Sequence, residues 1–460
     1  MFLKINKRSI NNRIAFFVFL FPYLQGSIGL ITGRLLHCIL PIFSLFLIFL
    51  RNSRNANVKL KKKELYIWMC ILLPCIIRNY DIKMGVYNTV INFISVALIY
   101  KFLSRTNNWI DDFWSVIRIF CVIHFILGLF FLVNKNLLYS VVIPRFTMTE
   151  NTYKLLNEAI NNGYMTGICN HYSKMGMYMA LGTIAFAYPI YDKEMEGRKR
   201  KIALVMFFAF VIGLAMTGKR GPLLFTVLAL LIVFLEYSEK RLTRKAISRF
   251  FIGIFSLIIL FAIAYFKIPQ VQSVIARFSE SSNMEEMTNG RIDFFWVQAI
   301  EMFKNHPIIG YGWGAFKAYS KNGNHAHNIY LQLLTETGII GFFMVLIFFV
   351  SSILAIRKSI NITKGHDNQL CTCLKIGYAY QLFFLMYGFT GNPLYDGQCY
   401  LPYLLSCAMG LTVYFEYSYR LQKVKKNEKR INCNKNRQEL WGVIASVCIE
   451  DRNRKERTES

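Results

Sequence analysis

The sequence predicts an all-α integral membrane protein with about twelve transmembrane helices and a large extracytoplasmic loop, containing short helices, between spans nine and ten. Three observations predict this fold class: an apolar composition, apolar runs that recur along the chain, and an uneven distribution of Lys and Arg. Only 17% of the 460 residues are charged, whereas 54% are hydrophobic and 16% are aromatic. Since soluble domains carry about a quarter charged residues, the composition excludes a soluble or disordered chain.

Twelve apolar runs are candidate membrane spans. A span needs about 20 mostly apolar residues, or fewer where aromatic and basic side chains reach the interface. The runs lie near 14–33, 35–50, 65–77, 86–101, 113–133, 175–191, 202–217, 221–237, 250–266, 338–356, 370–390 and 398–417. We therefore expect one membrane domain over residues 1–419.

The basic residues orient these spans. Segment 1–13 is basic and no small-residue cleavage site follows it, so we expect an uncleaved first span. If this segment is cytoplasmic and the spans alternate, the inside receives more than twice as many Lys and Arg as the outside, as the positive-inside rule requires. Both termini are then cytoplasmic, and residues 420–460 form a basic tail. Loops facing anionic lipid explain the net charge of +28, and no motif indicates nucleic-acid binding.

Polar motifs gather in the outer loop between spans nine and ten, about 267–337. Long ordered loops often contain functional residues, so we expect an extracytoplasmic site. Apolar residues at helical spacing after Gly290 predict an amphipathic helix in the membrane interface. Arg291 stands in its first turn, where a cation is unfavourable unless an anion also binds. An interfacial anchor beside Trp296 is the alternative.

The same loop contains a turn and a histidine pair. One proline and three glycines in 305–314 predict a tight, irregular turn, and a second helix is expected to begin near His325 and to meet the tenth span at Gly338. His325 and His327 would share a face only in an extended segment, and no third metal ligand stands at suitable spacing. A structural pair remains open, as does a general base or proton relay, for which an imidazole is suited.

The connection between spans seven and eight contains two adjacent cations, Lys219 and Arg220. The alternation of spans puts it on the outside, against the positive-inside bias, so a compensating interaction is expected. An anion such as the diphosphate of a lipid carrier would supply it through bidentate contacts with the arginine. Contact with lipid phosphates in general is the alternative. Gly218 and Gly221 let the backbone turn and approach a ligand closely.

Several motifs follow one another in the second half of the chain. They are Gly218-Lys219-Arg220-Gly221, Gly290-Arg291 before Trp296, Pro307-Ile-Ile-Gly310-Tyr-Gly312, and His327-Asn328 followed after nine residues by Gly338-Ile-Ile-Gly341. In this order and spacing they resemble the O-antigen ligase and polymerase superfamily of bacterial membrane glycosyltransferases.

The resemblance implies an enzyme that transfers a glycan from undecaprenyl diphosphate at the outer face of the bacterial cytoplasmic membrane, with no metal or other cofactor. It implies that Arg220 and Arg291 bind the diphosphate leaving group, and that His327 orients or deprotonates the acceptor hydroxyl. Stabilising charge on a leaving group is a major catalytic effect. The supporting residues that it implies are Lys219, Asn328, His325 and Tyr330.

Within the family the resemblance favours a polymerase of O-antigen, capsule or exopolysaccharide repeat units. Phe342 stands after the second glycine, where ligases usually have Thr or Val. A ligase that transfers the glycan to lipid A core is the alternative. The expected partners are lipid-linked oligosaccharides, membrane lipids, a chain-length regulator and a flippase. A flippase is itself the alternative from another class, but its polar residues would be expected near the bilayer midplane.

Overall fold

A computed structural model describes most of the helical part of the chain. The described residues are 7–24, 62–77, 108–145, 150–192, 195–237, 272, 295–320 and 323–428. Within these ranges the chain is mostly helical and contains no strand. The predicted spans near 35–50, 86–101 and 250–266 lie outside the described residues, as does the tail beyond residue 428.

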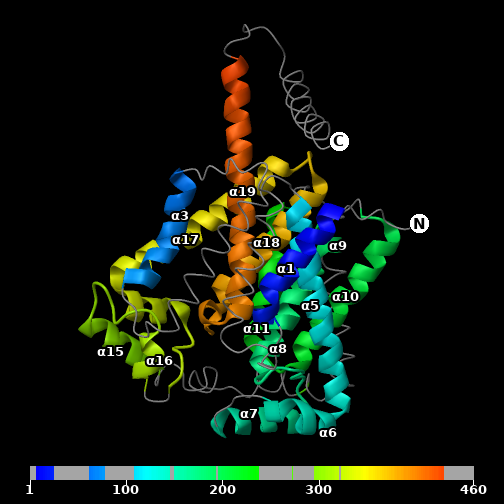
Figure 1. Cartoon of the computed structure of the whole chain (residues 1–460), viewed down its shortest axis with the longest axis vertical. Helices are drawn as coiled ribbons and strands as arrows, with labels where there is room; N and C mark the ends of the chain where they lie inside the picture. Colours follow the sequence, from blue (N-terminus) through cyan, green and yellow to red (C-terminus); the bar gives the residue numbers. More distant parts are fainter. Residues whose placement is uncertain are drawn as a thin grey trace.

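Long helices run side by side and form one bundle (Figure 1). They are α1 (Lys7–Leu24), α3 (Lys62–Ile77), α5 (Asn108–Val133), α8 (Tyr172–Ala185), α10 (Gly197–Met216), α11 (Arg220–Tyr237), α17 (Ile329–Thr363), α18 (Asn368–Tyr387) and α19 (Gly397–Glu428). The connections contain α6 (Lys135–Leu137), α7 (Glu150–Asn161), α9 (Tyr188–Tyr191), α15 (Val297–Asn305) and α16 (Ala315–Tyr319). Of these, α6, α7, α15 and α16 lie at the lower end of the bundle in Figure 1, here called the outer end because the predicted outer segments are there.

Four described helices are long and apolar enough to cross a membrane. They are Trp109–Val133 in α5, Arg220–Tyr237, Ile329–Thr363 and Asn368–Tyr387. The helical character is therefore confirmed for the described residues and fits a membrane protein, whereas the total of about twelve spans stays a prediction. The run near 175–191 is not one continuous helix, because α8 ends at Ala185 and α9 begins only at Tyr188.

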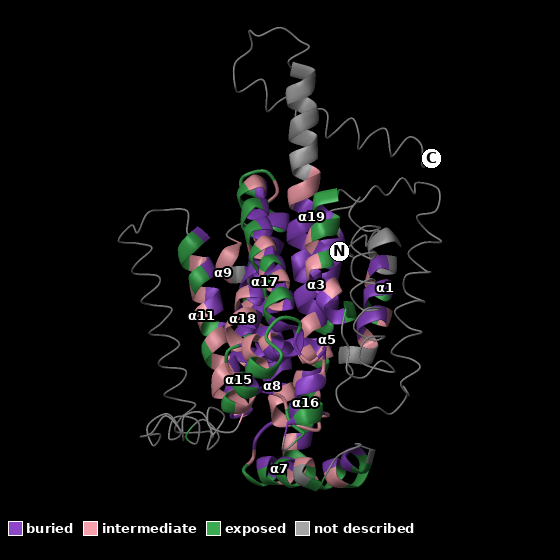
Figure 2. Ribbon diagram, turned by 90° about the vertical axis from the view of Figure 1, so that its left-hand side faces the viewer, coloured by how far each residue is buried: buried purple, intermediate pink, exposed green. Residues whose placement is uncertain are grey.

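Helix α8 lies at the centre of the bundle, where the buried residues concentrate (Figure 2). Every residue from Met175 to Ala185 is buried, and α8 packs against α5, α10 and α11. Gly182 allows one of these contacts, because a Cβ there would lie 2.4 Å from the Phe210 ring. An entirely buried helix shows no amphipathic pattern, which is why α8 looks like an ordinary span in the sequence.

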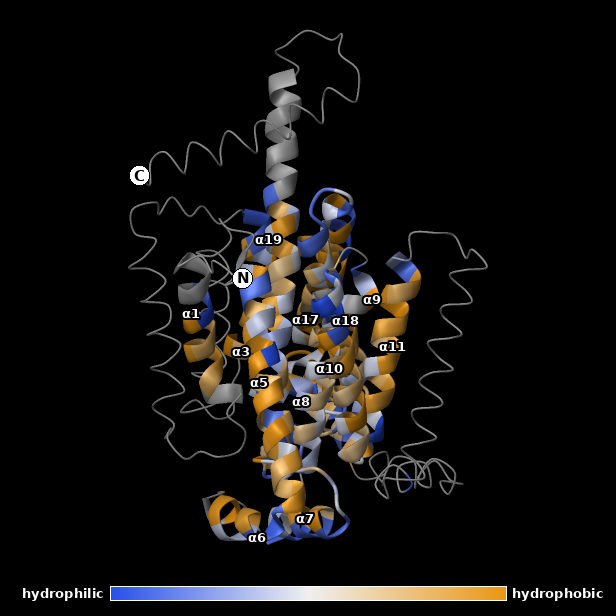
Figure 3. Cartoon of the chain, turned by 90° about the vertical axis from the view of Figure 1, so that its right-hand side faces the viewer, coloured by the Kyte–Doolittle hydropathy of each residue, from blue (hydrophilic) through white to orange (hydrophobic). Residues whose placement is uncertain are grey.

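The outward faces of the long helices are apolar, as in a protein surrounded by lipid (Figure 3). On α17 the exposed apolar residues recur at helical spacing: Ile339, Ile340, Phe343, Ile347, Val350 and Leu354. The opposite face of the same helix is buried against α3, α18 and α19. A contiguous exposed apolar surface of this kind is typical of contact with a membrane.

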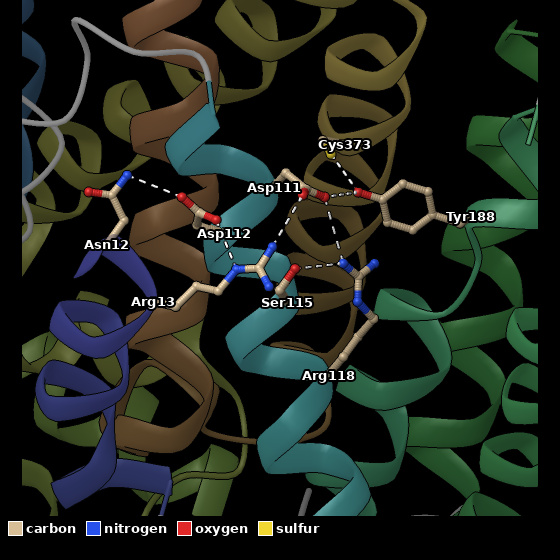
Figure 4. Close-up of polar contacts among 8 residues, drawn as sticks. All are labelled: Asn12, Arg13, Asp111, Asp112, Ser115, Arg118, Tyr188 and Cys373. Carbon is tan, nitrogen blue, oxygen red and sulfur yellow. Dashed lines mark hydrogen bonds and ion pairs between the residues drawn. The ribbon is translucent and has the colours of Figure 1, made fainter. Parts of the chain in front are cut away.

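A network of charged and polar side chains joins α1, α5, α9 and α18 at the other end of the bundle, the inner end (Figure 4). Arg13 Nε lies 2.9 Å from Asp112 Oδ1, and Arg118 Nη2 lies 3.7 Å from Asp111 Oδ1. Tyr188 donates to Asp111 at 3.2 Å. The carboxylates of α5 thus hold neighbouring helices through paired charges, which lowers the cost of burying them.

Candidate active site

The hairpin between α10 and α11 presents Lys219 and Arg220 at the outer end. Gly218 has φ 68°, and a Cβ there would lie 2.5 Å from the Tyr164 ring, so the turn requires glycine. The Lys219 ammonium lies 3.8 Å from the centroid of the Tyr172 ring, a cation–π contact. Lys219 is therefore held beside the start of α8, and Arg220 follows it as the first residue of α11.

His171 caps the start of α8 and connects the hairpin with the histidine loop. Its Nδ1 accepts a hydrogen bond from Ser173 N at 3.0 Å, and its ring stacks on Tyr172 with centroids 4.7 Å apart. Burial, together with the nearby charges of Lys219, Lys174 and His327, lowers the pKa of His171 to about 3. The charges that lower the pKa of His171 thus belong to residues of α8, the hairpin and the loop before α17.

His327 stands in that loop with φ 53°, a left-handed conformation that is uncommon outside glycine. The next residue, Asn328, caps α17 by accepting from Tyr330 N at 3.0 Å and from Leu331 N at 3.1 Å. The helix that we predict near His325 therefore begins at Ile329. The Phe295 ring meets the His327 ring edge to face at 5.7 Å.

The connection between α18 and α19, residues 388–396, lies against both the hairpin and the histidine loop. Ile329 N donates to Gly388 O at 2.8 Å, and Tyr330 Oη donates to Leu385 O at 2.7 Å. On the other side, a Cβ on Gly221 would lie 3.3 Å from Thr390 Oγ1. This connection therefore brings two segments together that are about a hundred residues apart in the sequence.

Asp396, in the same connection, adds a carboxyl group to this end of the protein. Burial raises its pKa, and the charges of Lys174 on α8 and Lys317 on α16 oppose that rise. The sequence prediction missed both lysines and Asp396. The local sequence indicates only a turn in this segment, through Gly391-Asn392-Pro393.

A second network fixes His325. Gln332 Nε2 lies 3.0 Å from His325 Nδ1 and 3.0 Å from Glu336 Oε1, and the Gln332 oxygen accepts from Ala326 N at 3.1 Å. Burial, together with the charge of Lys317, lowers the pKa of His325 to about 4. His325 is therefore neutral near pH 7 and lies beside Tyr395, with ring centroids 5.1 Å apart.

The glycine-rich turn that we predict before His325 is present and pairs with α17. Tyr311 N donates to Thr335 O at 3.0 Å, and Gly312 N donates to Glu336 O at 2.7 Å. Gly338, where we expect the junction with the tenth span, interrupts the helix with φ 62° and ψ −171°. The predicted turn and junction are therefore two parts of one contact.

The predicted site residues fall into two groups. Lys219, Arg220, His325, His327, Asn328 and Tyr330 all lie at the outer end around the segments just described. Arg291 lies outside the described residues, so the predicted start of a helix beside it stays a prediction; the described helical residues begin with a π turn at 295–296 and continue as α15. Among the described residues, no three His, Cys, Asp or Glu side chains form a group that would hold a metal ion.

One comparison with known proteins bears on this region. Residues 204–346 match a family model described as O-antigen ligase, a segment that runs from α10 into α17 and includes both the hairpin and the histidine loop. No curated protein matches the chain. Members of the matched family are membrane glycosyltransferase-like enzymes. The segment 204–346 supports the placement of this protein in the O-antigen ligase and polymerase superfamily.

Proposed function

We propose that this protein is a polymerase of surface-polysaccharide repeat units. It transfers the growing glycan from undecaprenyl diphosphate to the non-reducing-end hydroxyl of the next lipid-linked repeat, at the outer face of the bacterial cytoplasmic membrane. The observation that supports this most is that the cationic hairpin and the histidine loop converge, since the charges of Lys219 and His327 both lower the pKa of His171. Leaving-group binding and acceptor activation need such neighbours.

The proposed chemistry places the donor diphosphate beside the hairpin and the acceptor hydroxyl beside His327. The acceptor oxygen attacks the anomeric carbon, and the bond from this carbon to the diphosphate oxygen breaks. The electron pair leaves with the diphosphate, whose charge Lys219, Arg220 and Arg291 stabilise. The acceptor proton passes to the imidazole of His327, a step for which general-base catalysis contributes ~10²- to 10⁴-fold.

The polymerase is preferred to the ligase because of Phe342, which follows Gly341 at the start of the membrane part of α17. It is preferred to a flippase because the cationic and imidazole groups gather at one end of the bundle. At the inner end, Arg13 is instead paired with Asp112.

The test is polymerisation by the purified chain in liposomes that contain undecaprenyl-diphosphate-linked repeat units. We expect lipid-linked glycans of increasing length. Arg220→Ala and Arg291→Ala should lose most of this activity. His327→Asn should lose ~10²- to 10⁴-fold, and Asn is chosen because it tolerates the left-handed conformation of residue 327.

The matched control is Arg200→Ala, which removes an exposed arginine from the first turn of α10, at the inner end. It should polymerise like the wild type. Transfer only to lipid A core would identify a ligase, and movement of intact repeats between leaflets without elongation would identify a flippase. Full activity of all three site variants would reject the site.

A further inference from the structure

His171 occupies a position between the two halves of the proposed site. Its ring stacks on Tyr172, and the ammonium of Lys219 lies 3.8 Å from the centroid of that same tyrosine ring. His327 is close enough to act on His171 electrostatically. His171 is therefore linked to the hairpin through the Tyr172 ring and lies within electrostatic range of His327.

The cap of α8 determines which nitrogen of His171 is protonated. Nδ1 accepts a hydrogen bond from Ser173 N, so it bears no proton, and Nε2 is the ring's only donor. Burial and the charges of Lys219 and Lys174 keep the ring neutral, because they lower its pKa to about 3. The result is one fixed N–H donor that neither gains nor loses a proton near pH 7.

The choice of histidine is itself informative. Ser, Thr, Asp and Asn are the strongly preferred residues at the N-cap of a helix, and this chain uses one of them, Asn328, to cap α17. Asn328 accepts from the residue two positions ahead, Tyr330, as His171 accepts from Ser173. An asparagine would therefore cap α8 equally well, but it would lack a donor at the position of the imidazole Nε2.

We propose that His171 is a further substrate-binding residue, whose Nε2–H donates a hydrogen bond to a phosphate oxygen of the lipid diphosphate. The inference rests on the proposed function for the identity of the ligand. Lys219 and Arg220 neutralise the diphosphate, and His171 orients it with a directional donor. Because His171 stays neutral, it does not compete with His327 for the acceptor proton.

The experiment compares His171→Asn, which keeps the cap, with His171→Ala, which removes it. His171→Asn should unfold at the wild-type temperature, whereas its kcat/KM for the lipid-linked donor should fall roughly ten- to hundredfold, the size of one hydrogen bond to a charged group. Its pH–rate profile should keep the wild-type shape, because His171 does not titrate in that range. His366→Asn, an exposed histidine between α17 and α18, is the control and should behave as wild type.

Binding of undecaprenyl diphosphate without sugar, measured by quenching of Trp fluorescence in detergent, separates the two proposals. We expect His171→Asn to weaken this binding by the same factor as it lowers kcat/KM. Wild-type kinetics and binding in His171→Asn would show that His171 is only a cap, and slower transfer with unchanged binding would also overturn the inference. If the wild type binds the lipid but does not polymerise, the proposed function fails while the binding comparison still tests His171.

Discussion

Glu336 shows how one buried carboxylate holds separate segments of the outer end together. It is completely buried and accepts hydrogen bonds from Gly314 N at 2.8 Å, Phe316 N at 3.2 Å and Tyr395 Oη at 2.6 Å. Gln332 adds a fourth bond. Burying a carboxylate is costly unless such donors surround it, so these contacts explain why Glu336 is tolerated inside α17.

Replacing Glu336 by alanine should destabilise the protein. The amide hydrogens of Gly314 and Phe316 would lose their acceptor in a buried place, at about 1–3 kcal/mol for each unsatisfied donor. We expect a clearly lower unfolding temperature in detergent, and lower transfer activity because His325 loses its support through Gln332. Glu301→Ala, on the exposed face of α15, is the control; equal unfolding temperatures of the two variants would contradict this account.

Two histidines predict how stability depends on pH. The pKa of His171 is lowered from 6.5 to about 3 and that of His325 to about 4, in both cases mainly by burial. Below pH 6.5 the unfolded chain therefore binds protons at these two positions that the folded chain does not, so the two histidines lower the stability as pH falls from 6.5 towards 4. The unfolding temperature should follow this trend, with a shallower slope in the double variant His171→Asn, His325→Asn. If the double variant had the same slope of unfolding temperature against pH as the wild type, these two histidines would not be the source of the pH dependence.

At the scale of elements, the turn 307–312 and the kink in α17 form one unit. Ile339 N donates to Pro307 O at 2.8 Å, and a Cβ on Gly338 would lie 2.3 Å from Ile308 O. The two backbones therefore approach as closely as glycine permits. This contact sets the direction in which α17 leaves the membrane part and continues towards His327.

Gly338→Ala should disrupt that unit. The added Cβ would overlap with backbone atoms that cannot turn away, in addition to the cost of about 1–3 kcal/mol for a side chain in a positive-φ conformation that is sparsely populated outside glycine. Gly365→Ala isolates the second effect, because Gly365 also has a positive φ, 79°, but its Cβ would meet nothing within 4 Å. Gly338→Ala should lower both the unfolding temperature and the transfer rate far more than Gly365→Ala, and similar losses would argue against the close approach.

At the scale of the whole molecule, the two ends of the bundle differ in their use of charge. At the inner end two arginines are paired with carboxylates, Arg13 with Asp112 and Arg357 with Glu236 at 2.6 Å. The outer end gathers cations and histidines around the proposed diphosphate site. An enzyme whose reaction takes place at the outer end has no need to open the inner one, whereas a flippase must open both ends alternately.

Asp112→Ala tests whether the inner network is structural. Asp112 is 1% exposed and accepts from Arg13 at 2.9 Å and from Asn12 at 3.1 Å, so its loss should cost about 2–3 kcal/mol. The unfolding temperature in detergent should fall, while kcat/KM per folded molecule stays unchanged. Lys154→Ala, which breaks an exposed pair with Glu150, should be nearly neutral. A loss of activity in folded Asp112→Ala would mean that the inner end takes part in the reaction.

Features that depend on local chemistry can be predicted from the residues alone. Apolar runs predict the helices, because each must satisfy its own backbone inside the membrane. The glycines predict the hairpin at Gly218 and the kink at Gly338, because only glycine adopts those conformations without strain. Asn328 is recognisable beside His327, although its role as the cap of α17 appears only in the structure.

The tertiary structure decided which of these segments meet. The candidate site gains three residues from distant parts of the chain: His171, Lys317 and Asp396. In the same way, Glu336 of α17 accepts a hydrogen bond from Tyr395, which lies just before α19. The apolar pattern of a helix determines that it packs, but not which neighbour it packs against or at what height. The packing of the whole bundle determines the neighbour of each helix and the height at which the two helices meet. In this way His171, the cap of α8, comes to lie beside the cationic hairpin.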